Sequence, residues 1–232
     1  MNIALILSGG TGSRLASVVP KQYIKVKGRL LISFALEAVL KSATIDAVYV
    51  VAALSWHNLI SEEIKGLDTA DKFKGFALPG ENRQLSIYNG LLELEKHYDE
   101  KDIVFIHDAA RPNLSEKIIE SVIGAVEEHD GALPVLPMKD TVYYSRSGRN
   151  IDELLDRSSI YAGQAPEAFR LGRYLDANRR LLPEKILGIN GSTEPAIMAD
   201  MDIAMLPGDE NNYKITTEAD MERFMRDIDA LE

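Results

Sequence analysis

The stretch from Leu7 to Gln22, LSGGTGSRLASVVPKQ, follows an apolar run at 3–7 that is typical of a buried strand. Its glycines allow the backbone to approach a ligand closely, and successive free N–H groups in such a loop can surround an anion. Arg14 and Lys21 place a planar guanidinium and a mobile ammonium beside it. The stretch therefore predicts a phosphate-binding loop after the first strand. The alternative is a glycine-rich turn from strand to helix that binds nothing.

Two common nucleotide-binding motifs do not fit this loop. A P-loop carries Gly-Lys-Ser/Thr, whereas Gly12 is followed here by Ser13 and Arg14. A dinucleotide fingerprint that begins at Gly10 requires a glycine where this chain has Leu15. An NAD-dependent oxidoreductase is therefore disfavoured.

Working outward from the loop, apolar runs typical of strands recur at 47–53, 103–107 and 132–136. Stretches with helical spacing lie at 32–40, 85–94 and 118–126. Such alternation predicts an α/β fold with a doubly wound, mainly parallel sheet. Ligands of such folds bind at the carboxyl ends of the strands, which is where the glycine-rich loop begins.

Shorter elements are expected around this framework. The runs at 74–78 and 203–206 have the composition of short strands. Asn82 is placed to cap the helix predicted at 85–94, and Thr217 with Asp220 has the spacing of a capping box. These signals place the start of two helices.

The alternation breaks after Leu136. The segments 138–145 and 151–155 flank the polar tip Arg146-Ser147-Gly148-Arg149, which predicts a β-hairpin arm at about 138–157. An isolated pair of strands is marginally stable in water. We therefore expect the arm to pack on a second subunit and form a homodimer.

Composition narrows the class of protein. The 232 residues carry 26 Lys+Arg against 36 Asp+Glu, a formal charge of −10, which disfavours a duplex nucleic-acid binder. We expect one domain over 1–232, because no linker-like stretch divides the chain. The chain has no cysteine, which excludes disulfides and thiolate metal sites. The sequence has no 18-residue apolar run and no signal-peptide pattern, so a cytoplasmic protein without a membrane partner is expected.

Several polar residues stand where a ligand is expected. Asp108 follows the strand at 103–106 and is a candidate Mg²⁺ ligand, although an ordinary ion pair with Arg111 is the alternative. His107 is expected to be a hydrogen-bonded histidine at the edge of the core. Arg83 and Ser86 lie near a helix N-terminus, where a phosphate is well received.

Two further cations are candidates for the site. The first could reach the ligand-binding edge of the sheet, and the second lies at the end of the arm. Lys214 precedes the last predicted helix, and Arg157 follows the arm. For both, as for Arg83, the alternative is a solvated surface cation.

The pieces SGGTGSR with PKQ, GENRQLSIYNGL, HDAARP, KDT, the region of Arg157 and NYKITT follow one another in order along nearly the whole chain. Together they resemble the cytidylyltransferase family that acts on 2-C-methyl-D-erythritol 4-phosphate or on ribitol 5-phosphate. The resemblance implies a Rossmann-like nucleotidyltransferase that uses Mg²⁺, transfers CMP from CTP to an alditol phosphate and releases pyrophosphate. The first expected acceptor is the erythritol phosphate of isoprenoid synthesis. A polyol phosphate such as ribitol 5-phosphate, used for a cell-surface polymer, is the alternative.

The resemblance also implies roles for particular residues. The loop that holds the CTP phosphates would comprise Ser8, Gly9, Gly10, Thr11, Gly12 and Ser13, with Arg14 and Lys21 on the triphosphate. The cytidine-recognising segment would comprise Gly80, Asn82, Arg83 and Ser86. The metal and acceptor-side carboxylate would be Asp108, flanked by Ala109, Ala110 and Arg111. The acceptor would be contacted by Thr141 and Arg157 from the partner subunit and by Thr193, and Lys214 would lie near the transferred phosphorus.

The chain departs from the family pattern at three places. Asn82 stands where members often have Asp, Ala165-Pro166-Glu167 where they commonly have Thr-Pro-Gln, and Thr193-Glu194-Pro195 where they commonly have Thr-Asp. The last two lie on the acceptor side, so the identity of the second substrate is open. A non-catalytic nucleotide-binding regulatory module is a hypothesis of another class. It is disfavoured because such a module does not need the retained charges around the transferred phosphorus.

Overall fold

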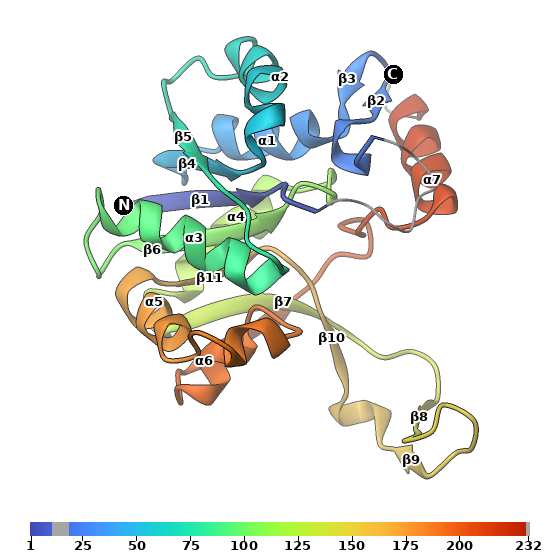
Figure 1. Cartoon of the computed structure of the whole chain (residues 1–232). Helices are drawn as coiled ribbons and strands as arrows, with labels where there is room; N and C mark the ends of the chain where they lie inside the picture. The colour runs from blue at the N-terminus through green and yellow to red at the C-terminus, as the bar shows by residue number, and fades with distance from the viewer. Residues whose placement is uncertain (11–18, 231–232) are drawn as a thin grey trace.

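The computed structural model describes residues 1–10 and 19–230. Within this part of the chain eight strands form one mixed sheet in the order β10-β7-β11-β6-β1-β4-β5, with β12 paired to β7 (Figure 1). The strands are β1 (Asn2–Leu7), β4 (Ala47–Val51), β5 (Phe73–Ala77), β6 (Ile103–Asp108), β7 (Gly131–Pro137), β10 (Tyr161–Gly163), β11 (Glu167–Arg170) and β12 (Ile203–Pro207).

The half of the sheet that contains β6, β1, β4 and β5 is parallel throughout. β4 and β6 are buried along their whole length and β1 along its centre, because apolar side chains occupy both faces of these strands. The expected doubly wound, mainly parallel sheet is confirmed. The exceptions are β10, which lies antiparallel to β7, and β11, which lies antiparallel between β6 and β7. β11 was not predicted, since EAFR is too short to show a strand pattern.

Helices cover both faces of the sheet (Figure 1). They are α1 (Leu31–Lys41), α2 (Leu54–Lys65), α3 (Arg83–Glu95), α4 (Glu116–Ala125), α5 (Leu171–Arg179) and α6 (Glu194–Met198). α7 (Glu218–Asp229) lies beside the sheet and packs on α1 through Phe224 (Figure 1). Successive residues of β1 point to opposite faces, so Ala4 and Ile6 pack in the core under α1, α2 and α4, whereas Ile3 and Leu5 pack in the core under α3 and α5. Both faces of β1 are thereby buried, and its end is held in place.

The predicted helix starts at Asn82 and Thr217 are confirmed. The Asn82 side chain accepts a 2.7 Å hydrogen bond from the N–H of Leu85 at the start of α3. Thr217 and Asp220 form a complete capping box at the start of α7. Both helices therefore begin at the edge of the sheet where the candidate site lies.

The arm projects from the body at the end of β7 (Figure 1). It contains the antiparallel pair β8 (Val142–Tyr144) and β9 (Glu153–Leu155), followed by a single turn of 3₁₀ helix at Arg157–Ser159. The strands are shorter than the segments 138–145 and 151–155 expected from sequence. The remaining short elements are β2 (Lys25–Val26), β3 (Arg29–Leu30) and two 3₁₀ turns at Lys21–Tyr23 and Lys185–Gly188.

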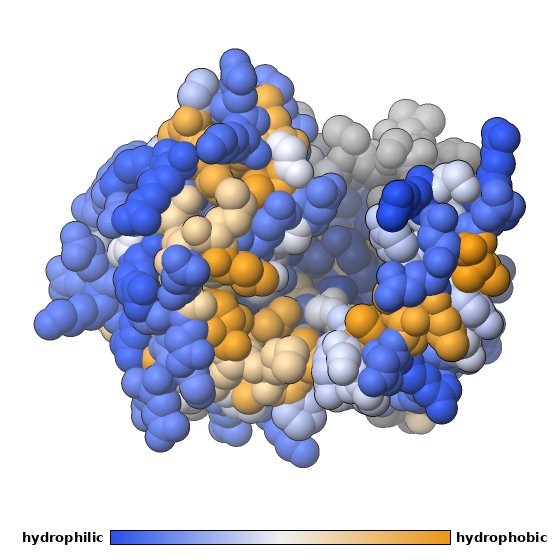
Figure 2. Space-filling view, turned by 90° about the horizontal axis from the view of Figure 1, so that it is seen from below, coloured by the Kyte–Doolittle hydropathy of each residue, from blue (hydrophilic) through white to orange (hydrophobic). Residues whose placement is uncertain are grey.

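The face seen from below is mainly hydrophilic, with separate apolar patches and a hollow between the body and the arm (Figure 2). Within the described residues no helix is both long and apolar enough to cross a membrane.

Candidate active site

The candidate site lies where β1 and β6 end side by side. These strands pair in parallel, and Leu7 lies opposite Asp108. The N–H of Ala109 donates a 3.0 Å hydrogen bond to the carbonyl of Leu7, so the two chains leave the sheet together. The start of the glycine-rich loop therefore lies beside Asp108, as the rule for parallel sheets predicts.

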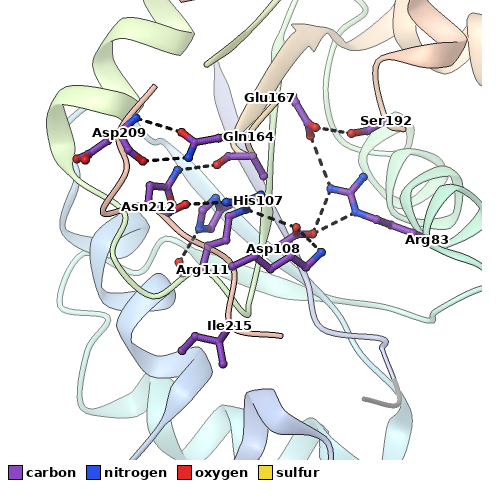
Figure 3. Close-up of polar contacts among 12 residues, drawn as sticks. Arg83, His107, Asp108, Arg111, Gln164, Glu167, Ser192, Asp209, Asn212 and Ile215 are labelled. Carbon is purple, nitrogen blue, oxygen red and sulfur yellow. Dashed lines mark hydrogen bonds and ion pairs between the residues drawn. The ribbon is translucent and has the colours of Figure 1, made fainter. Parts of the chain in front are cut away.

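Asp108 is buried and is surrounded by cations from three parts of the chain (Figure 3). Its Oδ1 accepts a 3.1 Å hydrogen bond from Nε of Arg83, at the start of α3. Its Oδ2 accepts a 2.8 Å hydrogen bond from Nζ of Lys214. Nε of Arg111 lies 3.8 Å from the same Oδ2. The simple Asp108–Arg111 pair considered from sequence is thus the longest of three contacts.

The cations keep the Asp108 carboxyl ionised. Burial by itself would raise its pKa, but the charges of Arg83 and Lys214 outweigh burial and hold the pKa well below its usual value. Burial likewise opposes the charge on Arg83, yet Asp108 and Glu167 together raise the pKa of that guanidinium. The site therefore holds full charges of both signs at neutral pH.

A second buried carboxylate, Glu167, lies on the other side of Arg83. β11 places it opposite Ile106, two residues before Asp108 in β6. Its Oε1 accepts a 2.5 Å hydrogen bond from Oγ of Ser192, and its Oε2 is 3.7 Å from Nη2 of Arg83. Burial raises the pKa of Glu167. Glu167 was not a predicted site residue, although its segment was noted as a departure from the family pattern.

His107 and Arg111 support the loop after β6. His107 is completely buried, not at the edge of the core as expected, and its Nε2 is 2.9 Å from the carbonyl of Arg111. Burial lowers the pKa of His107 to about 4, so the ring is neutral at pH 7. Nη1 of Arg111 donates a 2.6 Å hydrogen bond to the carbonyl of Asn212. Arg111 thus links the β6 loop to the segment before α7.

The described part of the glycine-rich loop is held by Gln22. Its Nε2 donates hydrogen bonds to the carbonyls of Ser8, at 2.9 Å, and Gly10, at 2.7 Å. A side chain at Gly9 would meet Cβ of Pro79 at 2.5 Å, so only glycine allows this approach to the loop after β5. Of the residues assigned to the CTP phosphates, Thr11, Gly12, Ser13 and Arg14 lie outside the described residues.

Lys21 and Lys214 converge on one segment. Nζ of Lys21 donates a 2.5 Å hydrogen bond to the carbonyl of Ile215, the residue after Lys214. The N–H of Ile215 in turn donates a 2.9 Å hydrogen bond to the carbonyl of Ala110. Lys21, Lys214 and Asp108, which were assigned from three separate motifs, are therefore brought together. The flanking Ala109 and Ala110 are both buried.

The segment assigned to cytidine is shaped by its own side chains. Oγ of Ser86 accepts a 3.0 Å hydrogen bond from the N–H of Gly80 and donates one of 2.8 Å to the carbonyl of Asn82. Nδ2 of Asn82 donates two 3.0 Å hydrogen bonds, to the carbonyls of Ile186 and Leu187. An aspartate at position 82 could cap α3 but could not donate these two bonds, which gives the departure at Asn82 a structural reason.

The three acceptor-side residues are not gathered at Asp108. Thr141 and Arg157 are exposed on the arm, and Nη1 of Arg157 donates a 2.7 Å hydrogen bond to the carbonyl of Lys139. Thr193 is half-buried at the start of α6, next to Ser192, which contacts Glu167. Among the described residues, Lys21, Lys214 and Asp108 are thus brought together within one chain, whereas two acceptor residues lie on the projecting arm.

The fold and the site define the class of this protein. A doubly wound sheet whose carboxyl edge carries a glycine-rich loop, a buried carboxylate and converging cations is suited to hold a nucleoside triphosphate. The comparison with known families is more specific. The chain belongs to the 2-C-methyl-D-erythritol 4-phosphate cytidylyltransferase (IspD) family, whose sequence model matches residues 2–225. It is a CTP-dependent cytidylyltransferase, which confirms the expected enzyme class and removes the regulatory-module hypothesis.

Relatives with two different acceptors are similar to this chain. The 2-C-methyl-D-erythritol 4-phosphate cytidylyltransferase of Rubrobacter xylanophilus is 35% identical over 94% of this chain and 91% of that protein. The ribitol-5-phosphate cytidylyltransferase of Streptococcus agalactiae serotype III is 30% identical over 100% of this chain and 97% of that protein. The bifunctional enzyme IspD/IspF of Granulibacter bethesdensis is 35% identical over 97% of this chain, which spans only 56% of that relative's length.

A solved structure shows the same fold. The 4-diphosphocytidyl-2C-methyl-D-erythritol synthase from Anaerococcus prevotii superposes with a TM-score of 0.83, covering 98% of this chain and 96% of that chain. The two sequences are 23% identical, so this likeness supports the fold class.

Proposed function

We propose that this cytidylyltransferase transfers CMP from CTP to 2-C-methyl-D-erythritol 4-phosphate. A phosphate oxygen of the acceptor attacks the α-phosphorus of CTP, the bond from that phosphorus to the bridging oxygen breaks, and pyrophosphate leaves with the bond's electron pair. The observation that carries the proposal is the convergence of Arg83, Arg111 and Lys214 on buried Asp108 beside the glycine-rich loop. Such a site can hold a triphosphate in line with its attacker.

Fixed cations supply most of the catalysis in this proposal. Negative charge grows on the oxygens of the α-phosphoryl group and on the leaving pyrophosphate during transfer. The ammonium group of Lys21 is hydrogen-bonded to the carbonyl of Ile215 and that of Lys214 to Asp108, so both are held near the growing charge and need little reorganisation during the reaction. Arg14 is assigned to the triphosphate from sequence.

Mg²⁺ is part of the proposal, and the residues present fit it. Within the described residues no group of three or more His, Cys, Asp or Glu forms a ready-made metal site. Mg²⁺ usually binds through one or two carboxylates together with waters and substrate phosphates, so Asp108 is sufficient on the protein side. Bound there, the ion would screen the charge of the triphosphate.

The acceptor is proposed to bind between subunits of a homodimer. Thr141 and Arg157 on the arm would face the acceptor held by the partner subunit, and Thr193 would contact it within the chain. Exposed apolar side chains on the arm support this arrangement, since Tyr143 is 54% and Leu154 is 63% exposed in the single chain. We infer that residues 1–232 act as one such domain in the cytoplasm.

Ribitol 5-phosphate is the second candidate acceptor. The two acceptor-side departures from the family pattern meet in space, because Glu167 is hydrogen-bonded to Ser192, the neighbour of Thr193. A relative of 30% identity over the whole chain carries the ribitol name. These observations make the second substrate the part of the proposal most in need of a test.

The test is a substrate panel. The purified protein is incubated with CTP, Mg²⁺ and one alditol phosphate at a time, and pyrophosphate is followed. We expect release with 2-C-methyl-D-erythritol 4-phosphate and little without an acceptor. Release with ribitol 5-phosphate or another unbranched polyol phosphate alone would replace the first choice by the second.

A further inference from the structure

Arg83 lies between two buried carboxylates, Asp108 and Glu167 (Figure 3). It is hydrogen-bonded to Asp108 and forms only a longer ion pair with Glu167. Its Nε and Nη2 are both 3.1 Å from Oδ1 of Asp108, whereas the same Nη2 is 3.7 Å from Oε2 of Glu167. A shift of about 0.8 Å would bring this second pair to ordinary hydrogen-bond length.

Glu167 has a free acceptor for the shifted guanidinium. Its Oε2 is buried and has no hydrogen-bond partner among the residues that the structure describes. Leaving a buried carboxylate oxygen without a donor is costly, and a guanidinium is the donor best suited to remove that cost. Ser192 occupies Oε1, so the oxygen left over is the one that faces Arg83.

Asp108, in contrast, has both oxygens engaged. Arg83 holds Oδ1 and Lys214 holds Oδ2. A cation that comes to Asp108 competes with Arg83 and Lys214 for these oxygens and repels both, so the partner that has a second anion within reach is the one that moves away. Arg83 keeps its charge under all ordinary conditions and therefore needs another anion when it leaves Asp108.

We propose that Arg83 is shared between the two carboxylates, and that Glu167 takes Arg83 over when Asp108 is engaged by CTP and its cation. This rests on the proposed function, in which Asp108 serves the nucleotide. Glu167 is then a positioning residue that acts through Arg83. The handover depends on the carboxyl group of Glu167, at a position where the resemblance implies a neutral Gln.

The first experiment needs no catalysis. Asp108→Asn removes the charge that holds Arg83 and keeps the shape of the side chain. In a crystal structure of this variant without ligand, we expect Nη2 of Arg83 within about 3 Å of Oε2 of Glu167. Arg83 remaining at position 108, or turning to solvent, would overturn the proposal.

A double-mutant cycle of protein stability tests the sharing of Arg83 independently. Glu167→Gln is made in the wild-type protein and in Asp108→Asn, and the urea midpoint is measured for all four proteins. We expect Glu167→Gln to lower the midpoint more in the Asp108→Asn background, where Arg83 depends on Glu167 alone. Equal shifts in both backgrounds would contradict the sharing of Arg83.

The third experiment addresses the nucleotide. The Mg²⁺ concentration that gives half of maximal CTP binding is measured by calorimetry for the wild type, for Glu167→Gln and for Glu95→Gln. Glu95 is the last residue of α3, the helix that begins at Arg83, and it pairs with exposed Arg179. Its variant removes a carboxylate away from the site and is therefore the matched control. We expect an increase on the order of tenfold for Glu167→Gln, about the effect of one charge-assisted hydrogen bond, and none for the control. An unchanged Mg²⁺ requirement would overturn the role of Glu167.

The two levels of the proposal fail differently. If the wild-type protein does not bind CTP, the proposed function is wrong, and the Asp108→Asn structure still decides whether Arg83 is shared. If CTP binds and Arg83 does not move, the function stands and the sharing is wrong.

Discussion

Nζ of Lys214 donates a 2.8 Å hydrogen bond to Oδ2 of Asp108, although 106 positions separate the two residues in the sequence. The contact joins the segment before α7 to the end of β6. Lys21 reaches the same segment through the carbonyl of Ile215. The two lysines are thus positioned by a single piece of backbone that is anchored to the centre of the sheet, which is the arrangement that charge stabilisation requires.

Lys21→Ala and Lys214→Ala should each lower turnover by on the order of 10²-fold or more with the fold retained, because each removes a fixed cation from the charge that develops in transfer. Pyrophosphate release measures the rate, and circular dichroism checks the fold. Lys65→Ala, which removes an exposed lysine of α2, is the control and should be near normal. Near-normal turnover in either site variant would exclude that lysine from catalysis.

Gln22→Met should weaken CTP binding on the order of tenfold while the fold is kept. The substitution preserves volume but removes the Nε2 donor that holds the carbonyls of Ser8 and Gly10, so the loop loses its fixed shape. Calorimetric titration with CTP measures the effect, and the thermal midpoint reports on folding. Unchanged affinity would show that the loop does not depend on Gln22.

Asn82→Asp should destabilise the protein by about 1–3 kcal/mol. Aspartate still caps α3, but it cannot donate to the carbonyls of Ile186 and Leu187 and places a negative charge beside them. Urea unfolding at pH 7 measures the change. Asn58→Asp, at an exposed position of α2, introduces the same charge as a control and should change stability by less than about 0.5 kcal/mol. Equal effects of the two changes would contradict the role given to Nδ2.

Asp220→Asn tests a pH dependence at the start of α7. Burial would raise the pKa of Asp220, but hydrogen bonds from the N–H groups of Thr216 and Thr217 outweigh it and lower the pKa to about 2. A carboxyl with a depressed native pKa contributes stability above its unfolded value of about 3.9, and this is lost as the pH falls towards 2.

Since Asp220 is partly exposed, we expect Asp220→Asn to lower the free energy of unfolding by about 1 kcal/mol at pH 6. The difference between wild type and variant should shrink as the pH falls from 5 to 2.5 in urea titrations. A difference that stays constant with pH would show that the Asp220 charge is not the cause.

Leu154→Glu should keep the protein monomeric if the arm forms the proposed dimer. The side chain is 63% exposed in the single chain, so the change costs little in the monomer but buries a charge in an interface. Sedimentation velocity measures the mass. Met225→Glu, at a 46% exposed position of α7 away from the arm, is the control. A dimeric Leu154→Glu protein would place the interface elsewhere.

Much of the fold was predictable because its signals are local. The central strands are apolar runs, and the start of α3 is marked by the capping side chain of Asn82. β11 was missed because its four residues carry Glu and Arg, so its place between β6 and β7 depends on partners distant in the sequence. The strands of the arm are shorter than the segments that flank its polar tip, because only Val142–Tyr144 and Glu153–Leu155 pair.

The sequence by itself determined the central strands, most of the helices around them, the family and the residue types gathered at the carboxyl edge of the sheet. These follow from periodicity, capping and motif order, which are read over a few neighbouring residues. Only the tertiary structure decided that Arg83 lies between Asp108 and Glu167. It also decided that the Asn82 amide donates to the carbonyl of Ile186 and that His107 is fully buried. Such pairings depend on strand order and burial, because an ion pair or hydrogen bond forms only between groups that the whole fold brings to within a few ångströms.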